Sequence, residues 1–226
     1  MAESPLQILE TVAIRAVPAI IAITLHEAAH GYVARFFGDD TAEKAGRITL
    51  NPLRHIDPFG TIVLPALLLL ANTGFVFGYA KPVPVNFGRL NHPKRDMIWV
   101  AAAGPGMNFL LAAISALLIL LLALAGVALR GPALALLWGS VEINLVLAIF
   151  NLIPIPPLDG GRVAVGLLPL PQALRLNQLS RYGIFLVLAL FVILPRIGID
   201  IFHWLVEIPV QAIESVIVAV IRSVMH

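Results

Sequence analysis

The stretch "AIIAITLHEAAHGYVARFFGD", from Ala19 to Asp39, places ionisable side chains inside an apolar run of membrane type. His26, Glu27 and His30 lie near its middle, although a charged group in lipid costs about 3 kcal/mol even on lenient scales. On an α-helix the two histidines project from one face, one turn apart. The pattern H-E-x-x-H therefore predicts two imidazole ligands for one zinc ion, with a glutamate beside them. The alternative is a polar cluster that links helices.

The composition is that of an integral membrane protein. Of 226 residues, 59% are hydrophobic and 12% are charged, whereas ordinary globular chains carry about 25% charged residues. The mean hydropathy is +0.93. The chain has no cysteine, which excludes disulfides and thiolate ligands, and its net charge of +2 is too small to suggest a nucleic-acid partner. We expect a single membrane-embedded domain over residues 1–226.

Apolar segments that could cross a membrane recur along the whole chain. A span needs about 20 residues, so the segment at Tyr182–Leu194 is short and is expected to borrow residues upstream, from Gln172. The fold class predicted is an all-α polytopic membrane protein with five to six transmembrane helices. The candidate segments are Leu6–Phe37, Phe59–Tyr79, Met97–Leu129, Pro132–Ile153, Tyr182–Leu194 and Ile199–Ile221.

The distribution of basic residues indicates that Phe59–Tyr79 enters the membrane and returns. If it returns, all of the 15 lysines and arginines lie on one side except Arg15, Arg130 and Arg196. If it crosses, the two sides carry more even numbers. The positive-inside rule therefore favours a re-entrant segment, with the basic side in the cytoplasm. Nearby, "GRITL" (Gly46–Leu50) and "KPVPV" (Lys81–Val85) are expected to form short β-strands at the membrane surface.

A catalytic zinc ion needs a third protein ligand and an open position. The best candidate is Asp159, in the stretch "NLIPIPPLDGGRV" (Asn151–Val163), which directly follows a membrane segment. Prolines and glycines allow a tight, fixed turn there. Taken alone, "PPLDGG" is typical of a turn with a capping aspartate. Beside a two-histidine site that lacks a third ligand, the metal-binding interpretation is favoured.

Three separated motifs, "HEAAH", "GPGMN" and "NLIPIPPLDGG", resemble those of the site-2 protease family of intramembrane zinc metalloproteases. The stretches "GRITLNPLRHIDPFGTIVLPALLLL" and "KPVPVN" resemble its minimal bacterial and archaeal branch, without a PDZ or CBS domain. The resemblance runs from Thr24 to about Val165, and the protease core is expected over about residues 6–165. Two additional C-terminal membrane helices, over about residues 172–222, lie outside it.

The resemblance implies roles for individual residues. His26, His30 and Asp159 would bind one zinc ion per chain, and Glu27 would act as the general base. Asn108, the last residue of "GPGMN", would position the substrate or stabilise the developing oxyanion.

The resemblance also implies the kind of reaction and where it occurs. The protein would hydrolyse peptide bonds within or near transmembrane segments of membrane protein substrates, as in regulated intramembrane proteolysis. It would lie in the lipid bilayer of the cell membrane, with its active site opening toward the cytoplasm and without a nucleic-acid partner. Two alternatives come from other classes: a transporter of metal ions or protons, and a non-catalytic membrane scaffold. Transporters often show internal pseudo-symmetry, and none is detectable here.

Three further polar residues have open roles. Asn144 and Asn151 could support a metal ligand or simply link helices, and helix linking is favoured for Asn144. His55 is either a solvated loop residue or a group that approaches the metal.

Overall fold

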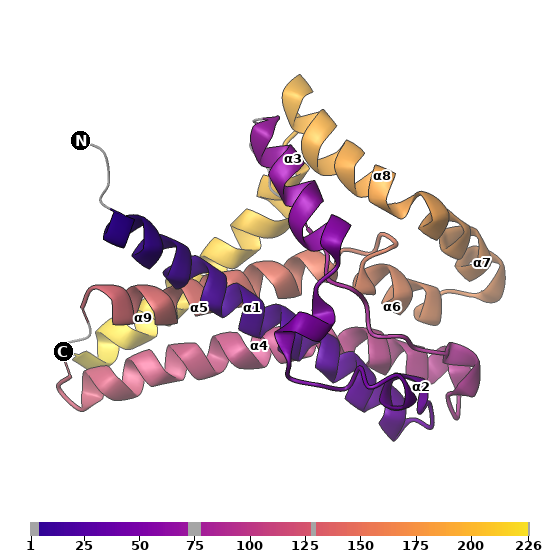
Figure 1. Cartoon of the computed structure of the whole chain (residues 1–226), viewed down its shortest axis with the longest axis horizontal. Coiled ribbons are helices and arrows are strands. Elements are labelled where there is room, and N and C mark those ends of the chain that lie inside the picture. Colours follow the sequence, from indigo (N-terminus) through magenta and orange to yellow (C-terminus); the bar gives the residue numbers. More distant parts are fainter. Residues whose placement is uncertain (1–4, 72–77, 128–129, 226) are drawn as a thin grey trace.

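Every regular element of the structure is a helix in the part of the chain that is described. The structure is a computed structural model and describes residues 5–71, 78–127 and 130–225. Figure 1 shows long helices gathered along one axis, with α3 (Leu64–Leu70) and the arm formed by α7 (Leu170–Gln178) and α8 (Gly183–Leu188) projecting from them. The predicted all-α membrane architecture is confirmed.

Helix α4 (Pro93–Leu124) is the centre of the bundle. It packs against α1 (Pro5–Phe36), α5 (Pro132–Asn151) and α6 (Asp159–Leu167), and α9 (Ile208–Met225) contacts both α4 and α5. The helix continues without interruption through Pro105. It begins at Pro93 rather than at the expected Met97, and the expected end at Leu129 lies outside the described residues.

Among the described residues, four helical stretches are long and apolar enough to cross a membrane. One of them joins α7, η4 (Leu179–Tyr182), α8, η5 (Ala189–Ile193) and η6 (Leu194–Ile197) into a single stretch. The short segment at Tyr182–Leu194 does therefore extend upstream, as expected. The number of crossings, five to six, stays a prediction. The four stretches are Pro93–Leu124, Pro132–Asn151, Leu170–Ile197 and His203–Val224.

The segment predicted to re-enter the membrane returns to its starting point. Its helices η2 (Pro58–Val63) and α3 form one short apolar helix, Pro58–Leu70, which is below the roughly 20 residues that a span needs. The backbone N–H of Tyr79 donates to the carbonyl of Gly60 at 3.0 Å, so the two ends meet. A path that returns to its start is compatible with the re-entrant segment, which stays a prediction. Residues 72–77, which include most of the "ANTG" stretch, lie outside the described residues.

The prediction of β-strands at Gly46–Leu50 and Lys81–Val85 is wrong. Both stretches are described, and neither is a strand. Two prolines within Lys81–Val85 remove backbone donors that a ladder would need. Side chains take the place of a ladder: Arg47 Nη2 donates to the Lys81 carbonyl at 2.7 Å, and the Val83 N–H donates to Glu27 Oε2 at 2.8 Å.

Buried Asp39 holds together the two loops between α1 and α4, residues 37–57 and 78–92, through hydrogen bonds. Its Oδ2 accepts from the backbone N–H of Asn86 at 2.6 Å, and its Oδ1 accepts from the N–H and hydroxyl of Thr41. The carbonyl of Phe37 accepts from the N–H of Asn91. The two loops therefore lie together at one end of the bundle. They contain the short helices α2 (Thr41–Lys44), η1 (Pro52–His55) and η3 (Phe87–Arg89).

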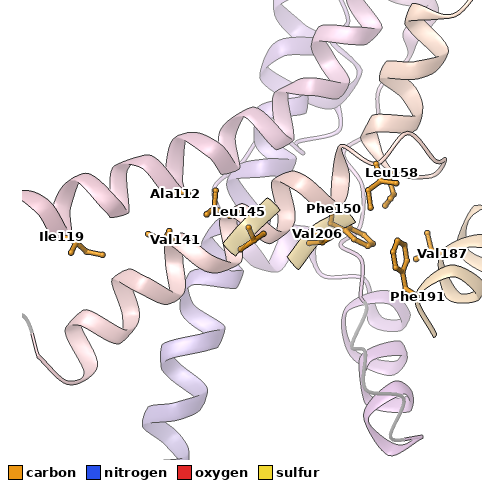
Figure 2. Close-up of a cluster of buried hydrophobic side chains, with 11 residues drawn as sticks. Ala112, Ile119, Val141, Leu145, Phe150, Leu158, Val187, Phe191 and Val206 are labelled. Atoms are coloured by element: carbon orange, nitrogen blue, oxygen red, sulfur yellow. The ribbon is translucent and has the colours of Figure 1, made fainter. Parts of the chain in front are cut away.

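The apolar core lies where α4 and α5 meet the C-terminal helices, among them η7 (His203–Glu207). Figure 2 shows Phe150 of α5 facing Phe191, and their ring centroids are 5.3 Å apart. Val187 and Val206 are fully buried beside them. Because Phe150 and Leu158 of this core flank the turn that leads to Asp159, packing here sets where that turn lies.

Candidate metal centre

The two histidines of α1 lie side by side, as their spacing predicts. Their Nε2 atoms are 3.1 Å apart, and both rings are buried. Each Nδ1 faces α4: that of His30 lies 2.7 Å from the backbone carbonyl of Val100, and that of His26 lies 2.6 Å from Oδ1 of Asn108. A backbone carbonyl can only accept, so Nδ1 of His30 carries a proton, and in the neutral ring Nε2 then presents a lone pair.

The start of α6 brings Asp159 to the same point. Its Oδ2 lies 3.1 Å from His26 Nε2 and 3.3 Å from His30 Nε2. The turn before it is so tight that a Cβ at Gly160 or Gly161 would overlap the backbone of residues 152–156. This overlap explains the two glycines that follow the aspartate. Packing, rather than local capping, therefore determines where the carboxylate lies.

Helix α4 approaches this point through Gly104. A Cβ at this position would lie 2.5 Å from His26 Nε2 and closer still to His30 Nε2. Real Cβ atoms essentially never come so close to another side chain. The first glycine of "GPGMN" is therefore a requirement of space in front of the two imidazoles, which the sequence alone did not indicate.

The geometry of this group fits a metal ion. One ligand atom from each of His26, His30 and Asp159 lies within 4.8 Å of the others. Oδ2 of Asp159 is buried without a hydrogen-bond partner, so an electron-rich oxygen faces the imidazole nitrogens. Tetrahedral zinc with bonds of about 2.0–2.1 Å separates neighbouring ligand atoms by about 3.3 Å. The observed separations of 3.1, 3.1 and 3.3 Å match that spacing. Two nitrogens and one carboxylate oxygen are also the donor set of a catalytic zinc site.

Glu27 lies on the same helix but outside this group of three. Its Oε2 accepts from the backbone N–H of Val83 at 2.8 Å. Among the described residues, its Oε1 has no hydrogen-bond partner. One oxygen is thus held by the loop, and the other remains available to exchange a proton.

Comparison with known proteins agrees with this geometry. The sequence model of peptidase family M50 matches residues 15–130 and 125–194. The chain therefore belongs to peptidase family M50. A protein of Bacillus subtilis (strain 168) named "Putative zinc metalloprotease YwhC" is 42% identical over 179 residues, covering 76% of this chain and 77% of its own length. "Putative zinc metalloprotease Rip2" of Mycolicibacterium smegmatis is 31% identical over 195 residues, covering 84% of this chain and 68% of its own.

Membership of family M50 confirms the predicted resemblance to site-2 proteases. The protein is a zinc-dependent peptidase, and its apolar helices make it a membrane protein. His26, His30 and Asp159 all lie within the matched residues. No solved structure shows a significant match to the chain.

Several polar residues lie apart from the metal group. His55 is buried and its Nε2 lies 3.0 Å from the carbonyl of Thr49. This contact stabilises the loop that contains both residues. Asn151 donates to the carbonyl of Leu147 on its own helix. Asn144 differs from these two residues, because it hydrogen-bonds Asn108, whose Oδ1 faces His26.

Proposed function

We propose that this M50 peptidase is an intramembrane zinc endopeptidase that cuts peptide bonds within or near transmembrane segments of other membrane proteins. One observation carries the proposal: His26, His30 and Asp159, side chains that could hold a metal ion, converge inside a bundle that contains helices of membrane-spanning length. The single-domain organisation over residues 1–226 and the ligand roles of His26, His30 and Asp159 belong to this proposal.

The protein's own residues divide the chemistry between them. Zinc held by the three side chains would polarise a scissile carbonyl and make water easier to deprotonate. Glu27 takes the proton from water with its free Oε1 and later delivers it to the leaving amine. The Val83 N–H fixes the orientation of this carboxylate through Oε2. Both histidines are buried, which limits the access of bulk water to their ring nitrogens.

Asn108 has a role that its hydrogen bonds define. It is fully buried, its Oδ1 faces His26, and its Nδ2 donates to Asn144 Oδ1 at 2.8 Å. We propose that Asn108 holds the His26 ring in place. Its two N–H groups have the Asn144 oxygen and the Ala22 carbonyl as acceptors, at 2.8 and 3.4 Å. Stabilising an oxyanion would require one of them to turn away from its acceptor, so that part of the sequence-based expectation stays a prediction.

We also propose that the site opens toward the cytoplasm from the cell membrane. The hydrogen bonds of Asp39 and Arg47 hold the basic loops of residues 37–57 and 78–92 together at one end of the bundle. Because the chain has no cysteine, single cysteines at Arg54 and Arg130 give an unambiguous test in intact cells. A membrane-impermeant maleimide should label Arg130→Cys and spare Arg54→Cys. The opposite pattern would reverse the proposed orientation.

Substitution of Glu27 tests the proposed activity. The protein is reconstituted in vesicles with a fluorescent fusion protein that carries one transmembrane helix, and with casein as a soluble comparison. Glu27→Gln should abolish cleavage of the fusion and keep its zinc, because the amide cannot take a proton. Glu43→Gln, at an exposed glutamate that pairs with Arg35, is the matched control and should cleave normally.

Two results would contradict the proposal. Cleavage by Glu27→Gln at the wild-type rate would remove Glu27 as the base. Cleavage of casein with no cleavage of the membrane fusion would leave a peptidase but not an intramembrane one.

A further inference from the structure

We propose that Asn144 of α5 is a positioning residue that selects the tautomer of His26 through a relay of hydrogen bonds. The inference rests on the proposed role of His26 as a zinc ligand, and it extends that site to a third helix. The side chain of Asn144 hydrogen-bonds Asn108 and Ser140 rather than a ligand atom, so it acts through Asn108.

The relay runs across three helices. Nδ1 of His26 on α1 lies 2.6 Å from Oδ1 of Asn108 on α4. Nδ2 of Asn108 donates to Oδ1 of Asn144 at 2.8 Å, with the Ala22 carbonyl as a second acceptor at 3.4 Å. Nδ2 of Asn144 then donates to the backbone carbonyl of Ser140 at 2.8 Å.

The Ser140 carbonyl fixes the direction of every bond in the relay. A backbone carbonyl can only accept, so the NH₂ group of Asn144 must face it. This leaves the Asn144 oxygen as the group that faces Asn108, which must therefore present its own NH₂ group. The oxygen of Asn108 then faces His26, where only a protonated Nδ1 satisfies it. The relay consequently places a proton on Nδ1 of His26, and in the neutral ring this leaves a lone pair on Nε2.

This tautomer is the one that metal binding requires. A ligating histidine typically donates its other ring N–H to a fixed acceptor, which sets its orientation and its basicity. His30 meets that requirement in one step, because its Nδ1 faces the Val100 carbonyl. His26 has no carbonyl at that position, and it reaches one only through the two asparagines.

Burial makes the relay effective. Asn108 is 0% exposed and Asn144 is 1% exposed, so water cannot substitute for either amide. In a low-dielectric interior an unpaired amide is costly, and a satisfied chain of hydrogen bonds favours one arrangement. Simple helix linking does not need this order. The hydroxyls of Ser115 and Ser140 also join α4 to α5, at 2.9 Å. The Ser140 hydroxyl lies 3.4 Å from Nδ2 of Asn144, a longer contact than the 2.8 Å bond to the Ser140 carbonyl.

A pair of variants separates positioning from helix linking. Asn144→Leu removes the relay, whereas Ser115→Ala removes a polar contact between the same two helices and leaves the Ser140 carbonyl that accepts from Asn144 in place. We expect Asn144→Leu to weaken zinc binding by about 10- to 100-fold, the usual effect of losing such a supporting group. Ser115→Ala should bind zinc as the wild type does. Zinc affinity is measured on the full-length protein in detergent by competition with a fluorescent chelator.

The tautomer itself can be measured without any variant. Nitrogen-15 NMR of zinc-free wild-type protein with labelled histidine, at a pH where the rings are neutral, distinguishes Nδ1–H from Nε2–H. The His26 signals are assigned by their loss in His26→Ala. We expect Nδ1–H at His26, and a mixture of both tautomers in Asn144→Leu.

The outcomes separate this inference from the proposed function. Nε2–H at His26 in the wild type, or equal zinc affinity in Asn144→Leu and wild type, would overturn the relay and leave the zinc site standing. Full zinc binding by His26→Ala would instead show that His26 is not a zinc ligand, and it would refute the relay as well. If Asn144→Leu does not fold, the wild-type NMR measurement still decides.

Discussion

Replacing Gly104 with alanine should disable the metal centre while leaving the helix that carries it intact. A Cβ at this position would lie 2.5 Å from His26 Nε2, whereas ordinary contacts begin at 3.4 Å. The imidazole would have to retreat by roughly 0.9 Å. Zinc–ligand distances hold to within about 0.2 Å, so a retreat of this size removes the ligand. Loss of a ligand should exceed the 10- to 100-fold effect of losing a supporting group, and we expect zinc binding to weaken by more than about 100-fold.

Gly106→Ala is the matched control for this prediction. Gly106 lies on the same helix, and nothing lies within 4 Å of a Cβ built there. Both substitutions should favour the helix by about 1 kcal/mol, so a loss seen only in Gly104→Ala cannot come from a weaker helix. Metal content by mass spectrometry and affinity by chelator competition give the measurement, and circular dichroism checks the fold. If Gly104→Ala bound one zinc ion with wild-type affinity, the packing argument for this glycine would be refuted.

Three further predictions test other contacts. Zinc at a thousand times its Kd should stabilise the wild type by about 4 kcal/mol and raise its Tm, whereas Asp159→Asn should show no rise; a full rise would exclude the carboxylate as a ligand. Asp39→Asn should lower local stability by about 1–3 kcal/mol, because an NH₂ group would face a buried donor, and faster amide hydrogen exchange at Asn86 reports it. Gly166→Ala should destabilise the protein by about 1–3 kcal/mol through overlap with Ile98, and Ile98→Ala in that background should restore part of the Tm.

The three residues that converge in the structure, His26, His30 and Asp159, could be predicted from the sequence because each has a local or compositional signal. Two histidines four residues apart share a helix face whatever surrounds the helix. Asp159 stood out because a two-histidine site lacks a ligand and because "PPLDGG" follows a membrane segment. The re-entrant segment was predicted on another ground and stays a prediction: the number of basic residues on each side depends on the path of the chain and not on its packing.

The strands were predicted wrongly because strand pairing is a long-range property. Lys81–Val85 is β-prone in composition, yet the backbone N–H of Val83 bonds to Glu27, a partner far away in sequence. The supporting residues were missed for the same reason. Nothing local distinguishes Gly104 from a flexible glycine, or Asn144 from an amide that merely links two helices.

The sequence by itself determined that the protein lies in a membrane, that its backbone is helical and which side-chain types make up the candidate metal site. Apolar length and the four-residue histidine spacing are local properties, and lipid leaves the backbone few alternatives to a helix. Only the tertiary structure decided which carboxylate meets the imidazoles, how closely α4 approaches them and which acceptors hold their protons. Those features depend on contacts between α1, α4, α5 and α6, and no short stretch of the chain contains information about the distance between two helices.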